Sequence, residues 1–200
     1  MIYGHGDDTF SYPEIQVNFS SNCCCNVNNE YLIRHLQQRL APLISAYPHP
    51  SGLNLRKKIA DCEQIPETRV AVFNGATEAI YTIARFIESN KVYIAGPTFS
   101  EYEAASTATG KSIEKIYLQD LITGKVSQFE KRSMVWLCNP NNPDGVHFPK
   151  NRLQELINSN PDTWFVIDQS YADFIDFPVI YPADAKNNVI LVYSLTKQYT

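Results

Sequence analysis

The sequence contains no apolar run that approaches the roughly 20 residues a membrane-spanning helix needs. Its first ten residues include two acidic side chains and lack the basic-then-apolar pattern of a secretory signal peptide. Basic stretches are also missing, because 17 Lys and Arg stand against 21 Asp and Glu, for a formal net charge of −4. Neither a membrane nor nucleic acid is therefore expected as a partner, and the expected location is the cytoplasm.

Patterns that build disulfide frameworks or metal sites are also lacking. The cysteines are five in number, and three of them are adjacent: Cys23, Cys24, Cys25, Cys62 and Cys138. An odd count argues against a disulfide framework, and without a C-x-x-C spacing no metal site is expected. Reduced thiols in a loop are the plain interpretation of the triple, and a redox or metal role is the alternative.

Short apolar segments alternate with segments of helical spacing along most of the chain. At 200 residues with 44% hydrophobic side chains, the chain is long enough for one sizeable core. Strands are expected at 70–73, 92–95, 113–118, 134–138, 164–167 and 189–193, and helices at 77–88, 99–109 and 150–158. Continuous apolar strands that alternate with helices predict an α/β fold with a mostly parallel central sheet, covered by helices on both faces.

A different region precedes this pattern. Residues 1–28 are irregular and polar, a helix is expected over 30–44, and a second helix over 53–63 follows the break at 47–50. We therefore divide the chain into an N-terminal arm and helix, residues 1–45, and a large domain, residues 46–200.

Unusual residues fall just after several predicted strands, where open α/β sheets bind their ligands. Gly75, Ala76 and Thr77 follow the 70–73 segment and lead into a helix. Small residues and a helix N-terminus can hold a phosphate, and a simple helix cap is the alternative.

The segment 139–145, with sequence NPNNPDG, follows the 134–138 strand. Its two prolines and its glycine predict a rigid turn, on which the asparagine side chains can act as fixed donors. A tight surface loop is the alternative interpretation of the same residues.

Two further strands end in residues that can carry chemistry. Asp168 follows the 164–167 strand, with Tyr171 three residues later. A carboxylate at the end of a buried strand is costly unless it meets a cation or hydrogen bonds. The 189–193 strand is followed by Ser194 and then Lys197, which can act as a nucleophile if its pKa is lowered. An Asp cap and a solvated surface Lys are the corresponding alternatives.

The order of these motifs resembles one family. The matching stretches are YPHPSGLNLRKKIA, NGATEAI, GPTFSEY, NPNNPDG, IDQSY and SLTK. Together they resemble the fold-type I enzymes that depend on pyridoxal 5′-phosphate (PLP), in particular the branch of histidinol-phosphate aminotransferase and L-threonine-O-3-phosphate decarboxylase. The fold implied is the three-layer large domain of these transferases, preceded by the N-terminal arm and helix.

The resemblance also implies roles for individual residues. Lys197 matches the Schiff-base lysine and proton carrier, and Asp168 matches the partner of the pyridinium nitrogen. The remaining matches are Tyr171 and Asn142 at the ring 3-oxygen, Tyr102 stacked on the ring, Gly75, Ala76, Thr77 and Ser194 at the phosphate, and Asn22 at the substrate. Tyr47 matches a tyrosine that reaches the phosphate of a neighbouring subunit, which implies a homodimer. The catalytic set is Lys197, Asp168 and Tyr171.

The chain departs from the family pattern at three places. Gln169 and Ser170 stand where the family often has Glu and Ala, and Asn22 is followed by cysteines instead of Asn-Pro. The chain also ends three residues after Lys197, whereas the family continues with a phosphate-binding arginine and a C-terminal small domain. We therefore expect that these 200 residues are a fragment of a longer chain.

The activity implied is amino transfer between an amino acid, or a phosphorylated amino compound, and a 2-oxo acid. Decarboxylation of L-threonine phosphate is the alternative, because residues 4–6 and 17–22 resemble the start of that enzyme. A non-catalytic PLP-binding domain would need the lysine or the aspartate to be lost. An unrelated nucleotide-binding domain is disfavoured because G-x-G-x-x-G and G-x-x-x-x-G-K-[ST] are both absent.

Overall fold

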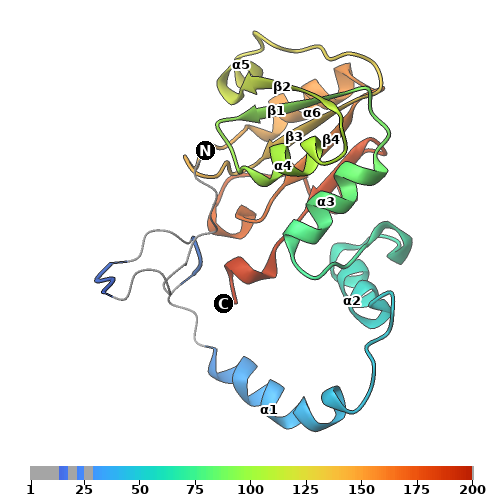
Figure 1. Cartoon of the computed structure of the whole chain (residues 1–200), viewed down its shortest axis with the longest axis vertical. Helices are drawn as coiled ribbons and strands as arrows, with labels where there is room; N and C mark the ends of the chain where they lie inside the picture. The colour runs from blue at the N-terminus through green and yellow to red at the C-terminus, as the bar shows by residue number, and fades with distance from the viewer. Residues whose placement is uncertain (1–13, 18–21, 25–28, 200) are drawn as a thin grey trace. The chain divides into compact units, whose positions relative to one another are not determined.

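The computed structural model describes residues 14–17, 22–24 and 29–199 (Figure 1). It divides into two compact units, Met1–Ser45 with Leu195–Thr200 and Ala46–Ser194. The sequence-based division placed residues 195–200 in the large domain, whereas here they group with the N-terminal unit. One physical link inside this smaller unit is a hydrogen bond of 2.9 Å from the Cys24 backbone N–H to the Lys197 carbonyl. No helix in the described part is long and apolar enough to cross a membrane.

The larger unit is built on a five-stranded sheet in which every pairing is parallel. Its strands are β1 Lys91–Gly96, β2 Ser112–Tyr117, β3 Ser133–Cys138, β4 Trp164–Asp168 and β5 Val189–Val192, in the spatial order β2-β1-β3-β4-β5. The central strand β3 is buried along its whole length, as its unbroken apolar run predicted. All five strands lie where the sequence pattern placed them.

Helices cover both faces of the sheet (Figure 1). On one face, α3 (Ala76–Phe86) and α4 (Glu101–Thr107) pack in a core with Met134 and Trp136. On the other face, α5 (Leu118–Ile122) and α6 (Lys150–Ser159) pack in a second core. The arrangement confirms the predicted three-layer α/β fold with a parallel central sheet.

The C-terminal end of α3 is bonded by Lys111, which lies directly before β2. Lys111 Nζ donates to the carbonyl of Ala84 and, at 2.6 Å, to that of Ile87. Burial lowers the pKa of this ammonium, and the helix-end carbonyls compensate part of that cost.

The segment from Val70 to Phe73 is a correction to the predicted elements. We expected a strand there, but in the structure these residues belong to no strand or sheet. The described part of the chain provides no strand to pair with it, and a strand needs a partner for its backbone groups. The helix α5 was also not expected, because its five residues are too few to show a helical period.

The remaining helices are short or lie outside the layers. Within the larger unit these are α2 (Leu53–Glu63), η2 (Glu67–Arg69), η3 (Ala172–Phe174) and η4 (Pro182–Asp184). The smaller unit contains α1 (Glu30–Ile44), in which no residue is buried, and η5 (Leu195–Lys197). The helices α1 and α2 match the predicted ranges.

Candidate cofactor site

The carboxyl ends of β1, β3 and β4 lie side by side because the strands are parallel. Cys138, the last residue of β3, is in register with Asp168, the last residue of β4. The Asn139 backbone N–H then donates to the Asp168 carbonyl at 2.8 Å. Asn141 Nδ2 donates to the Pro97 carbonyl at 2.8 Å, which ties the loop after β3 to the loop after β1. Three of the predicted motifs therefore meet at one edge of the sheet.

Asp168 is the only acidic side chain in the buried set of the described residues, at 4% exposure. Its Oδ1 accepts from the Ser170 backbone N–H at 2.9 Å and from the Ser170 hydroxyl at 2.6 Å. Its Oδ2 accepts from the Tyr102 hydroxyl at 2.7 Å. Within residues 46–194 no basic side chain forms an ion pair with this carboxylate. Three hydrogen bonds thus offset the desolvation of a negative charge, and a cation would stabilise it further.

Tyr102 lies in the core and not at an open surface. Its side chain has 0% exposure, and its ring stacks on Trp136 with centroids 5.0 Å apart and planes 7° apart. Burial and the Asp168 charge raise the pKa of this phenol well above its usual value, so it stays protonated and donates. Trp136 covers one face of the Tyr102 ring, and the expected stacking of a cofactor on this ring stays a prediction. Phe99, half-buried and edge-on to Tyr102 at 5.7 Å, is the aromatic of this motif with exposed surface.

Cys138 is buried, as are Tyr102 and Asp168, and it pairs in register with Asp168 at the carboxyl ends of β3 and β4. Burial first, and the Asp168 charge second, raise the pKa of its thiol to about 12. The thiol donates to the Pro140 carbonyl at 3.2 Å. It is therefore a neutral side chain at physiological pH, not a nucleophile.

The three asparagines of the 139–145 loop divide into two kinds. Asn139 is fully buried and bonds both backbone groups of Phe148, at 3.1 and 2.8 Å. Asn141, at 3% exposure, bonds the Pro97 carbonyl and the Asp144 carboxylate. These two side chains hold the loop together, whereas Asn142 is half-buried and lies toward the surface. The sequence alone did not separate the loop-building asparagines from the one that can face a ligand.

The N-terminus of α3 offers the features of an anion site. Gly75, its N-cap, has φ +91° and ψ 161°, a conformation that side-chain-bearing residues rarely adopt. A Cβ at Gly75 would meet no heavy atom within 4 Å, so the space above the helix start is open. The Glu78 carboxylate folds back to accept from the Asn74 backbone N–H at 2.5 Å. The first N–H groups of a helix have no partner within it, so an anion can bind them here.

The other predicted residues are distributed over both units. Tyr171 is half-buried directly before η3, and Ser194 is half-buried just after β5. Tyr47 is completely exposed, at 100%. In the smaller unit, Lys197 is half-buried at the end of η5 and Asn22 is exposed. Cys25 and residues 4–6 and 18–21 lie outside the described residues.

Two buried polar contacts at the end of β4 were missed by the sequence analysis. One is the pair of Ser170 bonds to Asp168, although a donor two residues after an Asp is a known local pattern. The other is Gln169, which is 1% exposed and accepts from the Tyr193 hydroxyl at 2.7 Å. Its backbone N–H also donates to the Val192 carbonyl at 2.7 Å, so the ends of β4 and β5 are joined twice.

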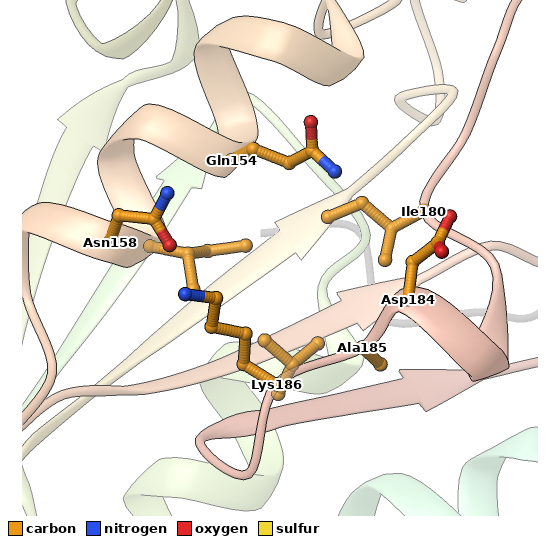
Figure 2. A pocket seen from close by; sticks show the side chains of 8 residues that line it. Gln154, Asn158, Ile180, Asp184, Ala185 and Lys186 are labelled. Atoms are coloured by element: carbon orange, nitrogen blue, oxygen red, sulfur yellow. The ribbon is translucent and has the colours of Figure 1, made fainter.

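A cavity of about 250 Å³ lies elsewhere, between α6 and the segment that leads into β5 (Figure 2). Its lining is a mixture of apolar and polar side chains: Gln154, Ile157, Asn158, Ile180, Asp184, Ala185, Lys186 and Val189. Val189 is the first residue of β5, so the cavity is at the amino end of that strand. The candidate site is at the opposite, carboxyl edge of the sheet. No group of three or more His, Cys, Asp or Glu in the described segments could hold a metal ion.

Comparison with known proteins decides the family. The model of the family "Aminotransferase class I and II" matches residues 14–200. The chain belongs to this family. Its members are PLP-dependent enzymes, and the resemblance inferred from the motifs is confirmed.

Several relatives are similar over most of this chain. Histidinol-phosphate aminotransferase 1 of Bacillus cereus (strain ATCC 14579) is 30% identical over 171 residues, which are 80% of this chain and 46% of that protein. The adenosylcobalamin biosynthesis bifunctional protein CobDQ of Leptospira interrogans is 30% identical over 92% of this chain and 22% of its own length. The chain therefore spans about half, or less, of the length of these relatives.

Solved structures agree on the fold. The L-threonine-O-3-phosphate decarboxylase from Porphyromonas gingivalis superposes with a TM-score of 0.83 at 36% identity, over 89% of this chain and 55% of that one. Histidinol-phosphate aminotransferase from Sinorhizobium meliloti, solved in complex with pyridoxal-5′-phosphate, has a TM-score of 0.73 at 17% identity, over 85% and 49% of the two chains. At that identity the second match shows the fold alone.

Proposed function

We propose that this chain is the cofactor-binding part of a PLP-dependent aminotransferase that acts on an amino acid or a phosphorylated amino compound, in the manner of histidinol-phosphate aminotransferase. The observation that carries the proposal is Asp168, a buried carboxylate held by three donors at the carboxyl end of β4. A carboxylate in such a place suits a pyridinium nitrogen, whose positive charge it can stabilise.

The residues at this edge of the sheet fit the parts of PLP. When bound, PLP supplies a ring that accepts electrons from the substrate α-carbon. Asp168 holds the proton on the ring nitrogen, and the open N-terminus of α3 at Gly75 receives the phosphate. Ala76, Thr77 and Ser194 add donors to that phosphate, and Asn142 and Tyr171 bond the ring 3-oxygen. Tyr102 is the aromatic for the ring face, and Phe99, which is half-buried and edge-on to it, is a second aromatic of the same motif.

Lys197 is the amine that binds the cofactor covalently. The same amine moves the proton at the substrate α-carbon. Asn22 contacts the substrate. Tyr47, which is wholly exposed, reaches the phosphate in a neighbouring subunit, so the active enzyme is a homodimer. The enzyme works in the cytoplasm on small-molecule amino donors and 2-oxo acids.

A second candidate is decarboxylation of L-threonine-O-3-phosphate. It is favoured by the 36% identity to the Porphyromonas gingivalis decarboxylase, which exceeds the 30% identity to the Bacillus cereus aminotransferase. Both activities use the same residues around the ring, so the described site fits either of them. They differ in which bond of the substrate α-carbon is broken.

The deciding experiment uses the full-length protein loaded with PLP. Histidinol phosphate with 2-oxoglutarate tests amino transfer, measured as glutamate formed. L-Threonine-O-3-phosphate tests decarboxylation, measured as carbon dioxide released. We expect glutamate formation from the first pair. Carbon dioxide from the second substrate without glutamate from the first would replace the main proposal by the second candidate. PLP loading without either product would contradict both substrates.

The phosphate role of the α3 N-terminus gives a separate prediction. Gly75→Ala is expected to weaken PLP binding about tenfold, because the added methyl enters the open space at the helix start and strains a backbone with positive φ. The dissociation constant for PLP, measured by fluorescence titration of the full-length protein, checks this. Gly110→Ala is the control, since Gly110 also has positive φ, at +70°, and no heavy atom within 4 Å of the added Cβ. Equal weakening in both variants would contradict a phosphate site at Gly75.

A further inference from the structure

Ser170 is a feature of this chain that the family pattern does not explain. The family often has Ala at this place, whereas here a hydroxyl donates to Asp168 Oδ1 at 2.6 Å. The Ser170 backbone N–H donates to the same oxygen at 2.9 Å. Ser170 is itself buried, at 9% exposure, so water does not compete strongly for these bonds.

The three donors divide unequally between the carboxylate oxygens. A carboxylate offers about four acceptor sites, two on each oxygen. On Asp168, Ser170 fills both sites of Oδ1, and the Tyr102 hydroxyl fills one site of Oδ2 at 2.7 Å. The Ser170 and Tyr102 donors do not occupy the second site of Oδ2. A carboxylate that rotated about its Cβ–Cγ bond would lose all three bonds at once.

We propose that Ser170 is a positioning residue that fixes the orientation of Asp168 and so presents Oδ2 as the acceptor for the pyridinium N–H of PLP. This inference rests on the proposed function, since it needs PLP to be the ligand. In this role the hydroxyl acts through Asp168. It occupies Oδ1, so Oδ2 is the oxygen that accepts from the ring N–H. The carboxylate is therefore already oriented in the free protein, and PLP binding does not have to order it.

The first test is the affinity of the full-length protein for two cofactors. One is PLP, and the other is 1-deaza-PLP, in which a carbon replaces the ring nitrogen. Ser170→Ala is expected to weaken PLP binding roughly tenfold, the typical effect of losing one hydrogen bond to a charged group. Binding of 1-deaza-PLP is expected to stay unchanged, because that ring has no N–H to place. A merely structural role of Ser170 would weaken both cofactors equally.

Two further variants separate the hydroxyl from the core around it. Ser170→Thr keeps the hydroxyl and is expected to restore PLP affinity to within about twofold. Ser106→Ala removes another fully buried hydroxyl of the same core, one that accepts from Trp136 Nε1 at 3.2 Å and does not bond Asp168. It is expected to bind both cofactors like the parent protein.

The outcomes distinguish failure of this inference from failure of the proposed function. If the parent protein bound neither PLP nor its analogue, the proposed function would fall first. A second outcome is that the parent protein binds PLP more tightly than 1-deaza-PLP and Ser170→Ala keeps this preference in full. That result would overturn the positioning role of Ser170 but would leave PLP as the cofactor. Equal losses for both cofactors, or tighter PLP binding in Ser170→Ala, would also overturn it.

Discussion

Lys197→Ala is expected to remove the visible absorption band of lysine-bound PLP and to lower turnover roughly 10⁴-fold or more. The variant loses both the amine that binds the cofactor covalently and the base that moves the α-proton. General acid–base catalysis alone contributes about 10²–10⁴-fold, and the covalent link adds to that. The measurements are the spectrum of the PLP-loaded full-length protein and the rate of glutamate formation.

A matched control uses Lys186, a lysine of the larger unit. Lys186 lines the cavity at the amino end of β5, at the opposite edge of the sheet from Asp168. Lys186→Ala is expected to keep the band and the rate. Adding a small primary amine to Lys197→Ala is expected to restore part of the turnover, because the amine can act as the missing base. Were the band to persist in Lys197→Ala, another amine would hold the cofactor and the assignment would be wrong.

The sheet was predictable because its strands are buried on both faces. Residues 134–138 form an apolar run of strand length, and such a run bounded by turn residues is typical of a central parallel strand. The segment 70–73 is likewise apolar but has no described strand beside it. The local sequence indicates whether a segment favours an extended backbone. Whether that segment joins a sheet depends on a second segment that can pair with it. The sequence alone therefore could not distinguish residues 70–73 from residues 134–138.

The candidate site was predictable in its parts and not in its connections. Asp168 could be found because an acidic residue directly after a buried strand is conspicuous. Its donor Tyr102 lies 66 residues away, and the sequence carries no sign that the phenol turns inward. The same limit applies to the backbone hydrogen bond between Cys24 and Lys197, which are far apart in the chain. Contacts between segments that are distant in the chain depend on how the elements pack. The periodicity of apolar residues along the sequence does not predict that packing.

Asp168→Asn is expected to lower turnover roughly 10³-fold while the protein retains PLP. The amide has nearly the same shape, but it carries no charge to keep the ring nitrogen protonated. Removing one member of a buried, hydrogen-bonded charge pair costs about 3–5 kcal/mol, which corresponds to roughly 10²–10⁴ in rate. The rate of glutamate formation, together with the fraction of protein that carries PLP, measures this effect.

The size of the effect separates Asp168 from its neighbours. Asp173→Asn is the control, because Asp173 lies exposed in η3 only five residues away, and it is expected to keep the parent rate. Tyr102→Phe leaves the charge in place and removes one donor to Oδ2, so its loss is expected to be about tenfold. This order of losses, Asp168→Asn far above Tyr102→Phe, follows if the charge at Asp168 stabilises the ring and the hydrogen bonds only hold it in place. Near-parent rates in Asp168→Asn would contradict the role of this carboxylate, even if PLP remained bound at Lys197.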